Sequence, residues 1–253
     1  MKPLNLFFGT SILFFTTVTS CKKDDNNNAP QTLYRKAVVL GSDSIRSFVT
    51  LDKSGQPLSI GVELGENALN NLPADTMPGM PDYMHPVPLP QFSNTTGVDH
   101  IEVDWNPFGH EPIPIYGVPH FDFHFYYITS GEQEVIIPGP DTVKVAVQFV
   151  PKNYVSGVVA IPDMGVHWVD TTAAEWHGTP FTAIFIYGFY HGKMIFLEPM
   201  ATKAFLQTHP DYSAEVKQPQ AFQQSNYYPN NYRIKYNPSR HSYVLTLSDL
   251  TKH

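Results

Sequence analysis

Residues 119–126 read Pro-His-Phe-Asp-Phe-His-Phe-Tyr, an alternation of metal-binding or acidic side chains with aromatic ones. Successive side chains of a β-strand point to opposite faces of its sheet. We therefore expect His120, Asp122 and His124 on one face and the phenylalanines on the other. Histidine and aspartate are residue types that bind transition metals. The pattern predicts a metal-binding strand in a barrel interior, and the alternative is a half-buried strand whose polar face meets water.

The spacing of the two histidines requires donors from elsewhere in the chain. His120 and His124 are about 13 Å apart on an extended strand, so they do not form a chelate by themselves. His167 ends a turn that contains a proline and a glycine, which favours an inward-pointing side chain at the start of the next strand. His110 lies on the proline-rich loop that precedes the key strand. The predicted ligands are His110, His120, Asp122, His124 and His167.

This donor set limits the identity of the ion. Imidazoles with at most one carboxylate and no thiolate favour Zn²⁺, Fe²⁺, Mn²⁺, Ni²⁺ or Cu²⁺ over Ca²⁺ or Mg²⁺. Asp122 is expected to bind the ion or to orient a ligand histidine, and Glu111 is the candidate general base. His177 is expected to cap or pack. The other histidines are expected to be structural or at the surface: His85, His100, His191, His209, His241 and His253.

The segment from Pro119 to Trp168 resembles the two metal-binding motifs of cupins. In the first motif His124 takes the place of a glutamate ligand and His120 that of a histidine ligand, while Val118 stands where another histidine is usual. The second motif, a strand followed by proline, glycine and histidine, is matched up to His167. The resemblance implies a β-barrel in which His167 approaches His120 and His124.

A longer resemblance, from about Ser44 to the C-terminus, is to an uncharacterised family of exported bacterial proteins. It is carried by Gly-His-Glu-Pro at 109–112 and by the alternating sequence at 119–126. The resemblance implies a shared site but names no reaction.

The N-terminus has the pattern of an export signal. Residues 1–20 place Lys2 ahead of an apolar run that is too short to span a membrane. Cys21, the only cysteine, follows this run and resembles the lipidated cysteine of bacterial lipoproteins; the alternative is an ordinary signal followed by a chance cysteine. Residues 21–31 are expected to form a flexible tether. The expected location is the cell outer membrane, with the protein facing either the periplasm or the exterior.

Residues 32–253 are expected to form a single β-rich domain, because short strand-like runs alternate with glycine- and proline-containing turns. The proline-rich stretch 73–91 is expected to be a strap across the barrel surface, or else a linker. We predict a cupin-like antiparallel β-barrel or sandwich with a few short helices. The predicted strands are 36–40, 45–51, 58–64, 98–105, 119–126, 133–137, 144–149, 157–161, 181–189, 232–236 and 242–247, with helical pieces at 66–72 and 202–207.

Composition narrows the function further. The net charge of -7 argues against nucleic acid as a partner. The 14 tyrosines could form a sugar-stacking surface, although tyrosines more commonly pack in the core. The first hypothesis is a lipid-anchored metal-binding protein that acts on a small molecule. The alternatives are a non-enzymatic surface binding protein for carbohydrate, metal or a protein partner, and a structural envelope protein whose histidines face water.

Overall fold

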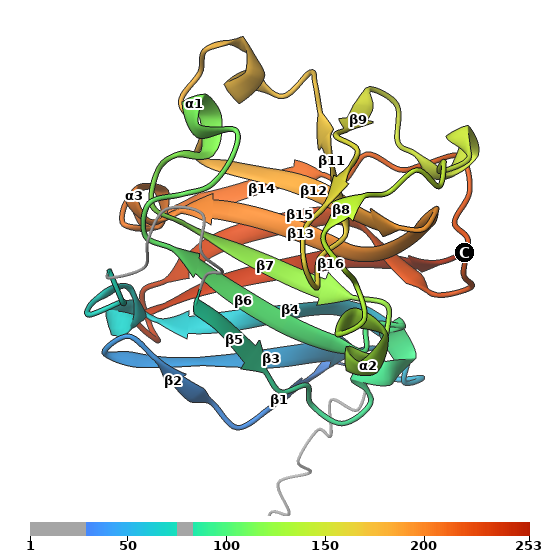
Figure 1. Ribbon diagram of the computed structural model, residues 1–253. Helices are drawn as coiled ribbons and strands as arrows, with labels where there is room; N and C mark the ends of the chain where they lie inside the picture. Colours follow the sequence, from blue (N-terminus) through green and yellow to red (C-terminus); the bar gives the residue numbers. More distant parts are fainter. Residues whose placement is uncertain (1–28, 75–82) are drawn as a thin grey trace, which may run out of the picture.

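The computed structural model describes residues 29–74 and 83–253, which form two antiparallel sheets packed face to face (Figure 1). The first sheet has the order β1-β3-β4-β16-β15-β14, and β2 pairs with β3 at its margin. Its strands are β1 (Gln31–Tyr34), β2 (Val38–Leu40), β3 (Asp43–Leu51), β4 (Pro57–Gly65), β14 (Asp211–Glu215), β15 (Tyr227–Asn237) and β16 (Ser242–Lys252).

The second sheet, which carries the alternating strand, has the order β5-β6-β7-β13-β12-β11-β9. Its strands are β5 (Tyr83–Val87), β6 (His100–Asn106), β7 (His120–Tyr126), β9 (Tyr154–Ser156), β11 (Val166–Asp170), β12 (Ala183–Tyr190) and β13 (Lys193–Thr202). A small ribbon of β8 (Gly139–Pro140) and β10 (Val159–Ala160) lies apart from both sheets. The helices are short: η1 (Glu66–Leu69), η2 (Ser93–Thr96), α1 (Ile113–Tyr116), α2 (Ser130–Gln133), η3 (Val147–Phe149), η4 (Ala174–His177) and α3 (Lys203–Leu206).

The prediction of a mainly antiparallel β fold is confirmed, and the architecture is a sandwich. Among the described residues neither sheet closes into a barrel, because β5 and β9 remain at opposite edges of the second sheet. Within the same residues, no helix has both the length and the apolar character needed to cross a membrane.

The phenylalanine face of β7 forms the core between the two sheets. Phe121, Phe123 and Phe125 are buried in one cluster with Ile60 and Val62 of β4. Burial of each such side chain contributes about 1.5–3 kcal/mol to the free energy of unfolding. Burial of the phenylalanines therefore fixes which face of β7 points into the core.

The opposite face of β7 is also buried, which rules out the water-facing alternative. His120 and His124 are 0% exposed and Asp122 is 4% exposed. Two smaller apolar clusters cover this outer face of the second sheet: Tyr116 packs there with Ile184, Ile186 and Met200, and Ile136 packs there with Tyr126 and Phe196. Because both faces of this sheet are covered, its polar groups are shielded from water and need partners within the protein.

Several predicted elements are confirmed. The turn between β3 and β4 is built by Asp52, whose carboxylate accepts hydrogen bonds from the backbone N–H groups of Ser54 and Gln56. Gly55 has the positive φ of 81° that this turn needs. The predicted helical pieces are present as η1 and α3 in shortened form. Residues 75–82 of the expected strap lie outside the described residues, whereas 83–87 form the edge strand β5, where Pro86 is tolerated because an edge needs fewer donors.

The strands predicted at 133–137 and 144–149 are wrong. Thr129 and Glu132 form a capping box, which begins α2 and directs the chain into a turn. The second segment pairs with no strand among the described residues and ends in η3, where Val147 is 84% exposed. The strands β1, β13 and β14 were not predicted. β13 reads as an almost continuous apolar run because both of its faces are covered, which removes the alternation.

Candidate metal centre

The register of the second sheet gathers polar side chains on its outer face. On β6, Asp104 lies opposite Asp122 of β7, and Glu102 lies opposite His124. On the other side of β7, β13 places Thr202 opposite His120. Because partners in a ladder point to the same face, the polar side chains of these three strands lie together.

The first group of potential ligands comprises His110, His120 and Asp122, whose ligand atoms lie within 4.8 Å of one another. Oδ1 of Asp122 is 3.2 Å from Nε2 of His120, and Oδ2 is 3.3 Å from Nε2 of His110. The amide of Asn106 donates to Oδ2 at 2.8 Å. The carboxylate is thus fixed between two imidazoles. We call these three residues triad 1.

The loop before β7 brings His110 over the sheet. Gly109 has a φ of 67°, and a Cβ at this position would lie 2.0 Å from the backbone oxygen of Tyr116. Only glycine allows this close approach and this conformation. The loop therefore folds back on itself and places the His110 ring against that of His120, with 4.7 Å between ring centroids.

The second group, triad 2, comprises His124, His167 and Glu198. Oε1 of Glu198 is 3.6 Å from Nε2 of His124, and Oε2 is 3.5 Å from Nε2 of His167. Glu198 lies on β13 and is 1% exposed. His167 lies on β11, where it pairs with Gly188 of β12. The arrangement repeats that of triad 1: each carboxylate directs its two oxygens at the Nε2 atoms of two histidines.

In three of these histidines, the other ring nitrogen faces an oxygen. Nδ1 of His120 lies 2.6 Å from the backbone oxygen of Val118, and Nδ1 of His110 lies 2.8 Å from that of Glu111. Nδ1 of His124 lies 3.2 Å from Oδ2 of Asp104. A carbonyl oxygen only accepts, so in the neutral ring of His110 or His120 it favours the tautomer with its proton on Nδ1, which directs the Nε2 lone pair at the triad. Metal-binding histidines are commonly oriented in this way.

The polar atoms at the two centres lack well-directed hydrogen bonds. Among the described residues, Nε2 of His120, Oδ1 of Asp122, Nε2 of His124 and Oε2 of Glu198 are buried without a hydrogen-bond partner. Buried polar atoms almost always have one. Metal–ligand bonds of about 2.1 Å place neighbouring ligand atoms roughly 3.0–3.4 Å apart, close to the 3.2–3.6 Å separations here. Each triad could therefore hold a metal ion.

The charges at this face are also unbalanced. Asp104, Asp122 and Glu198 are all buried, and no described Lys or Arg forms an ion pair with them. Burial raises the pKa of Glu198 to about 8. Burial raises the pKa of Asp104 as well. Divalent cations would compensate these carboxylates.

Without metal, protons on the neighbouring histidines compensate part of the negative charge of these carboxylates. Burial by itself would lower the pKa of His124, but the carboxylates of Glu198 and Asp104 outweigh it and raise the pKa to about 10. In the same way, Asp122 outweighs burial and raises the pKa of His110 to about 9. Burial, together with the positive charge of His124, lowers the pKa of His167.

The structure places all five predicted ligands in the two triads, divided differently from the expectation. The cupin resemblance implied that His120, His124 and His167 approach one another, whereas His120 lies with His110 and Asp122. Glu111 is exposed and accepts a hydrogen bond from the backbone N–H of Ile113 at 3.0 Å. Its carboxylate contacts neither triad among the described residues.

Glu198 is the site residue that sequence reasoning missed. It lies in β13, whose residues 194–200 are otherwise apolar, Met-Ile-Phe-Leu before it and Pro-Met after it. A single carboxylate inside a buried apolar run costs free energy unless it has a partner. That isolation is the signal that could have identified it.

Comparison with known proteins gives one family and no function. A family model described as TTHB210-like, hypothetical protein TTHB210, matches residues 52–105. The matched part ends before the first ligand, His110. No curated protein and no solved structure matches the chain.

Proposed function

We propose that the protein binds two divalent transition-metal ions, one at each triad, and uses them in a reaction on a small molecule. One observation carries the proposal. In both triads a buried carboxylate presents its two oxygens to the Nε2 atoms of two histidines, and three of these four rings have their other nitrogen facing an oxygen. This repetition on one sheet face is typical of ligand sets rather than of isolated ion pairs.

The ligand composition favours catalysis over a purely structural role. Two imidazoles and one carboxylate hold zinc in several hydrolases and ferrous iron in oxygenases. Three protein ligands leave coordination positions for water or substrate. A bound ion would supply Lewis acidity and lower the pKa of a coordinated water.

The chain supplies orientation and access. Asn106 holds Asp122 by donating to Oδ2, and Asp104 faces the back of the His124 ring. The side chains of His110 and His167 are 33% and 24% exposed, whereas their triad partners are almost fully buried. Solvent and a small molecule would reach each triad at these two histidines.

The test is the metal content of protein purified without a histidine tag. We expect two ions per chain in the wild type, one in Asp122→Asn, one in Glu198→Gln and none in the double variant. His191→Gln, on an exposed turn, is the matched control and should retain both ions. Equal metal content in the wild type and the folded double variant would refute the proposal.

We further propose export and lipid anchoring through Cys21 at the outer membrane. The support is the sequence pattern of residues 1–31, most of which lies outside the described residues. Cys21→Ser is expected to move the protein from the membrane fraction to the soluble fraction of cells that express the full chain. An unchanged distribution would contradict the anchor.

A further inference from the structure

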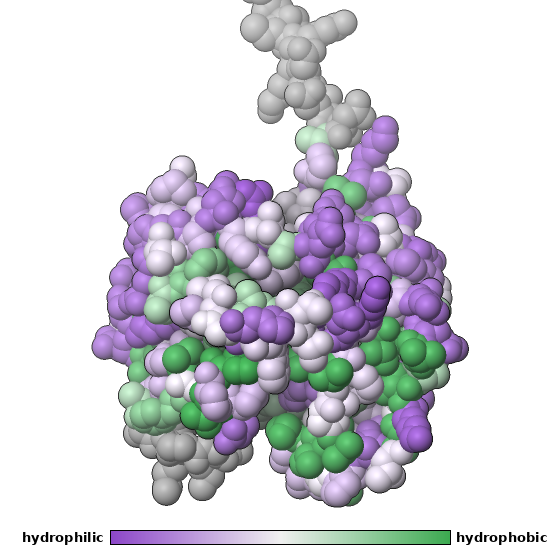
Figure 2. Space-filling view, turned by 90° about the horizontal axis from the view of Figure 1, so that it is seen from above, coloured by the Kyte–Doolittle hydropathy of each residue, from purple (hydrophilic) through white to green (hydrophobic). Residues whose placement is uncertain are grey.

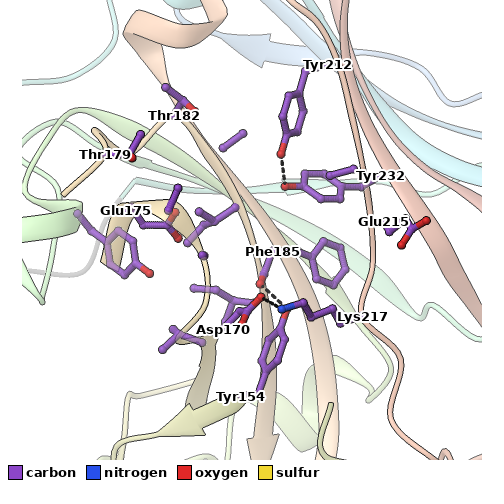
Figure 3. Close-up of a pocket in the computed structure, with 18 of the residues that line it drawn as sticks. Tyr154, Asp170, Glu175, Thr179, Thr182, Phe185, Tyr212, Glu215, Lys217 and Tyr232 are labelled. Atoms are coloured by element: carbon purple, nitrogen blue, oxygen red, sulfur yellow. Dashed lines mark hydrogen bonds and ion pairs between the residues drawn. The ribbon is translucent and has the colours of Figure 1, made fainter. Parts of the chain in front are cut away.

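A cavity of about 310 Å³ lies along the edge of β12 and is lined by residues of both sheets (Figure 3). It opens where both sheets end. β14 is the last strand of the first sheet, and β11 pairs with β12 only as far as Trp168 and Tyr187. The part of β12 from Ala183 to Ile186 thus has a free edge on this side, and it forms one wall.

Aromatic rings from both sheets line this cavity. Phe185 of the second sheet lies 5.3 Å from Tyr232 of the first, measured between ring centroids. Tyr212 packs edge-on against Tyr232 at 5.7 Å, and Tyr116 and Tyr154 complete the aromatic walls. Rings set at steep angles to one another present both faces and edges. Such an arrangement suits a flat apolar body or a cation held against ring faces.

Several polar groups of the cavity are already paired, as Figure 3 shows. The hydroxyl of Tyr154 donates to the backbone oxygen of Phe185 at 3.0 Å, and the hydroxyls of Tyr212 and Tyr232 are 3.1 Å apart.

Of the charged groups that line the cavity, Lys217 and Asp170 are paired, whereas Glu175 and the exposed Glu215 form no ion pair within the described residues. Lys217 forms an ion pair with Asp170 and donates to the hydroxyl of Thr172 at 2.7 Å. Glu175, by contrast, forms no ion pair within the described part of the chain, although it is half-buried. Burial raises its pKa, consistent with a carboxylate that lacks a cationic neighbour.

A second group lacks a partner in the same wall. The hydroxyl of Tyr116 is buried and makes no hydrogen bond to any described residue, and this tyrosine is 2% exposed. A buried hydroxyl without a partner is uncommon. Glu175 and Tyr116 both line the cavity, so one ligand could engage both.

We propose that this cavity binds a small organic amine, a protonated nitrogen attached to an aromatic or similarly flat body. Its ammonium group would donate hydrogen bonds to Glu175 and to the Tyr116 oxygen, and its flat body would lie among Phe185, Tyr212 and Tyr232. None of the residues that line the cavity belongs to a triad, although Tyr116 packs against His110 with 5.8 Å between ring centroids, and this inference does not rest on metal binding.

Three probes that share one phenol ring but differ in charge test the proposal by calorimetric titration. Tyramine is a cation, N-acetyltyramine is neutral, and 4-hydroxyphenylacetate is an anion. We expect saturable binding of tyramine at one site, binding at least tenfold weaker for the neutral probe, and none for the anion. Equal binding of the three probes, or none by tyramine, would overturn the proposal.

Matched variants locate the site. Glu175→Gln is expected to weaken tyramine binding at least tenfold, whereas Glu215→Gln, an exposed acid at the rim, should change it less than twofold. Tyr212→Leu should weaken it severalfold, and Tyr212→Phe, which keeps the ring, should not. An unaltered affinity in folded Glu175→Gln would refute the assignment.

The surface of the molecule seen from above is mixed in character. Viewed from above, the molecule shows separate apolar patches among hydrophilic residues (Figure 2).

Discussion

Nε2 of His124 lies 3.6 Å from Oε1 of Glu198, two buried side chains on neighbouring strands. The other nitrogen of the same ring lies 3.2 Å from Oδ2 of Asp104. The imidazole is thus held between two carboxylates that have no Lys or Arg partner within the described residues. One ring nitrogen thus faces Asp104, and the other faces Glu198.

The first prediction concerns this orientation. In a background of Asp122→Asn, which leaves only triad 2, Asp104→Asn should lower zinc affinity about 10–100-fold, as is usual when the residue that orients a ligand histidine is lost. The asparagine retains the shape but removes the charge that favours the proton on Nδ1. Competition titration with a chromophoric chelator measures the change.

The matched control is Asp99→Asn in the same background. Asp99 contacts His100, 3.0 Å between Oδ1 and Nδ1, but is more exposed and belongs to neither triad. We expect its zinc affinity to remain within twofold of the background. Equal losses in the two variants would show that Asp104 has no specific role.

The second prediction is that metal binding releases protons. His110 and His124 have pKa values raised to about 9 and about 10, so both are protonated at pH 7 in the metal-free protein. Ligand histidines must be neutral, and the ion must displace these protons. Calorimetry in buffers of different ionisation enthalpy should show more than one proton released per chain, with an apparent affinity that rises from pH 6 to 9. Proton-independent binding would contradict this assignment.

The third prediction concerns stability without metal. A group whose pKa is higher in the folded than in the unfolded chain stabilises the fold below its unfolded pKa, and this contribution is lost as the pH rises through the folded value. For His124 and His110 stability is lost from about pH 6.5, the pKa in the unfolded chain, up to their pKa values in the folded chain, about 10 and about 9. Glu198, with a pKa near 8, contributes with the same sign.

Chelator-treated protein should therefore lose stability between pH 7 and 9.5, and metal-loaded protein should not. The shift of the melting temperature is about 2–4 °C per kcal/mol for a chain of this size. Thermal unfolding followed by circular dichroism measures both forms. A melting temperature of the chelated form that rises with pH would contradict the protonation states inferred here.

The order of the strands explains which parts of the candidate site could be predicted from the sequence and which could not. The alternation in β7 identified both of its faces, because a period of two is a local property of the chain. It could not say that the polar face is covered, since the cover comes from Tyr116 and Ile136 on distant loops. The histidines were found by type, but their division into two triads depends on which strands become neighbours.

Glu198 could not be predicted for the same reason. It joins His124 only because β13 pairs with β7, a contact between residues about 70 positions apart in sequence. A strand buried on both faces lacks the alternation of polar and apolar residues by which a half-buried strand is recognised in a sequence. For this reason neither β13 nor its carboxylate was predicted. Sheet order, rather than residue chemistry, was the missing information.

The last prediction concerns Gly188, which pairs with His167. A Cβ at this position would lie 2.2 Å from the ring of Phe196, and that ring packs against His124 with centroids 4.8 Å apart. Gly188→Ala must therefore displace Phe196, whose ring contacts both His124 and His167. We expect a loss of about 1–3 kcal/mol in the free energy of unfolding, as for overpacked cores. Triad 2 should also bind zinc more weakly, while triad 1 is preserved.

Chemical denaturation and metal analysis of Gly188→Ala measure these two effects. Gly157→Ala is the matched control, because a Cβ there would meet no atom within 4 Å. It should keep the stability of the wild type within about 0.5 kcal/mol, as surface substitutions usually do, and retain both ions. If Gly188→Ala had the same stability and the same metal content as Gly157→Ala, Phe196 would not be fixed in its position beside triad 2. The packing inferred for that triad would then be wrong, since the ring would have room to move away from His124.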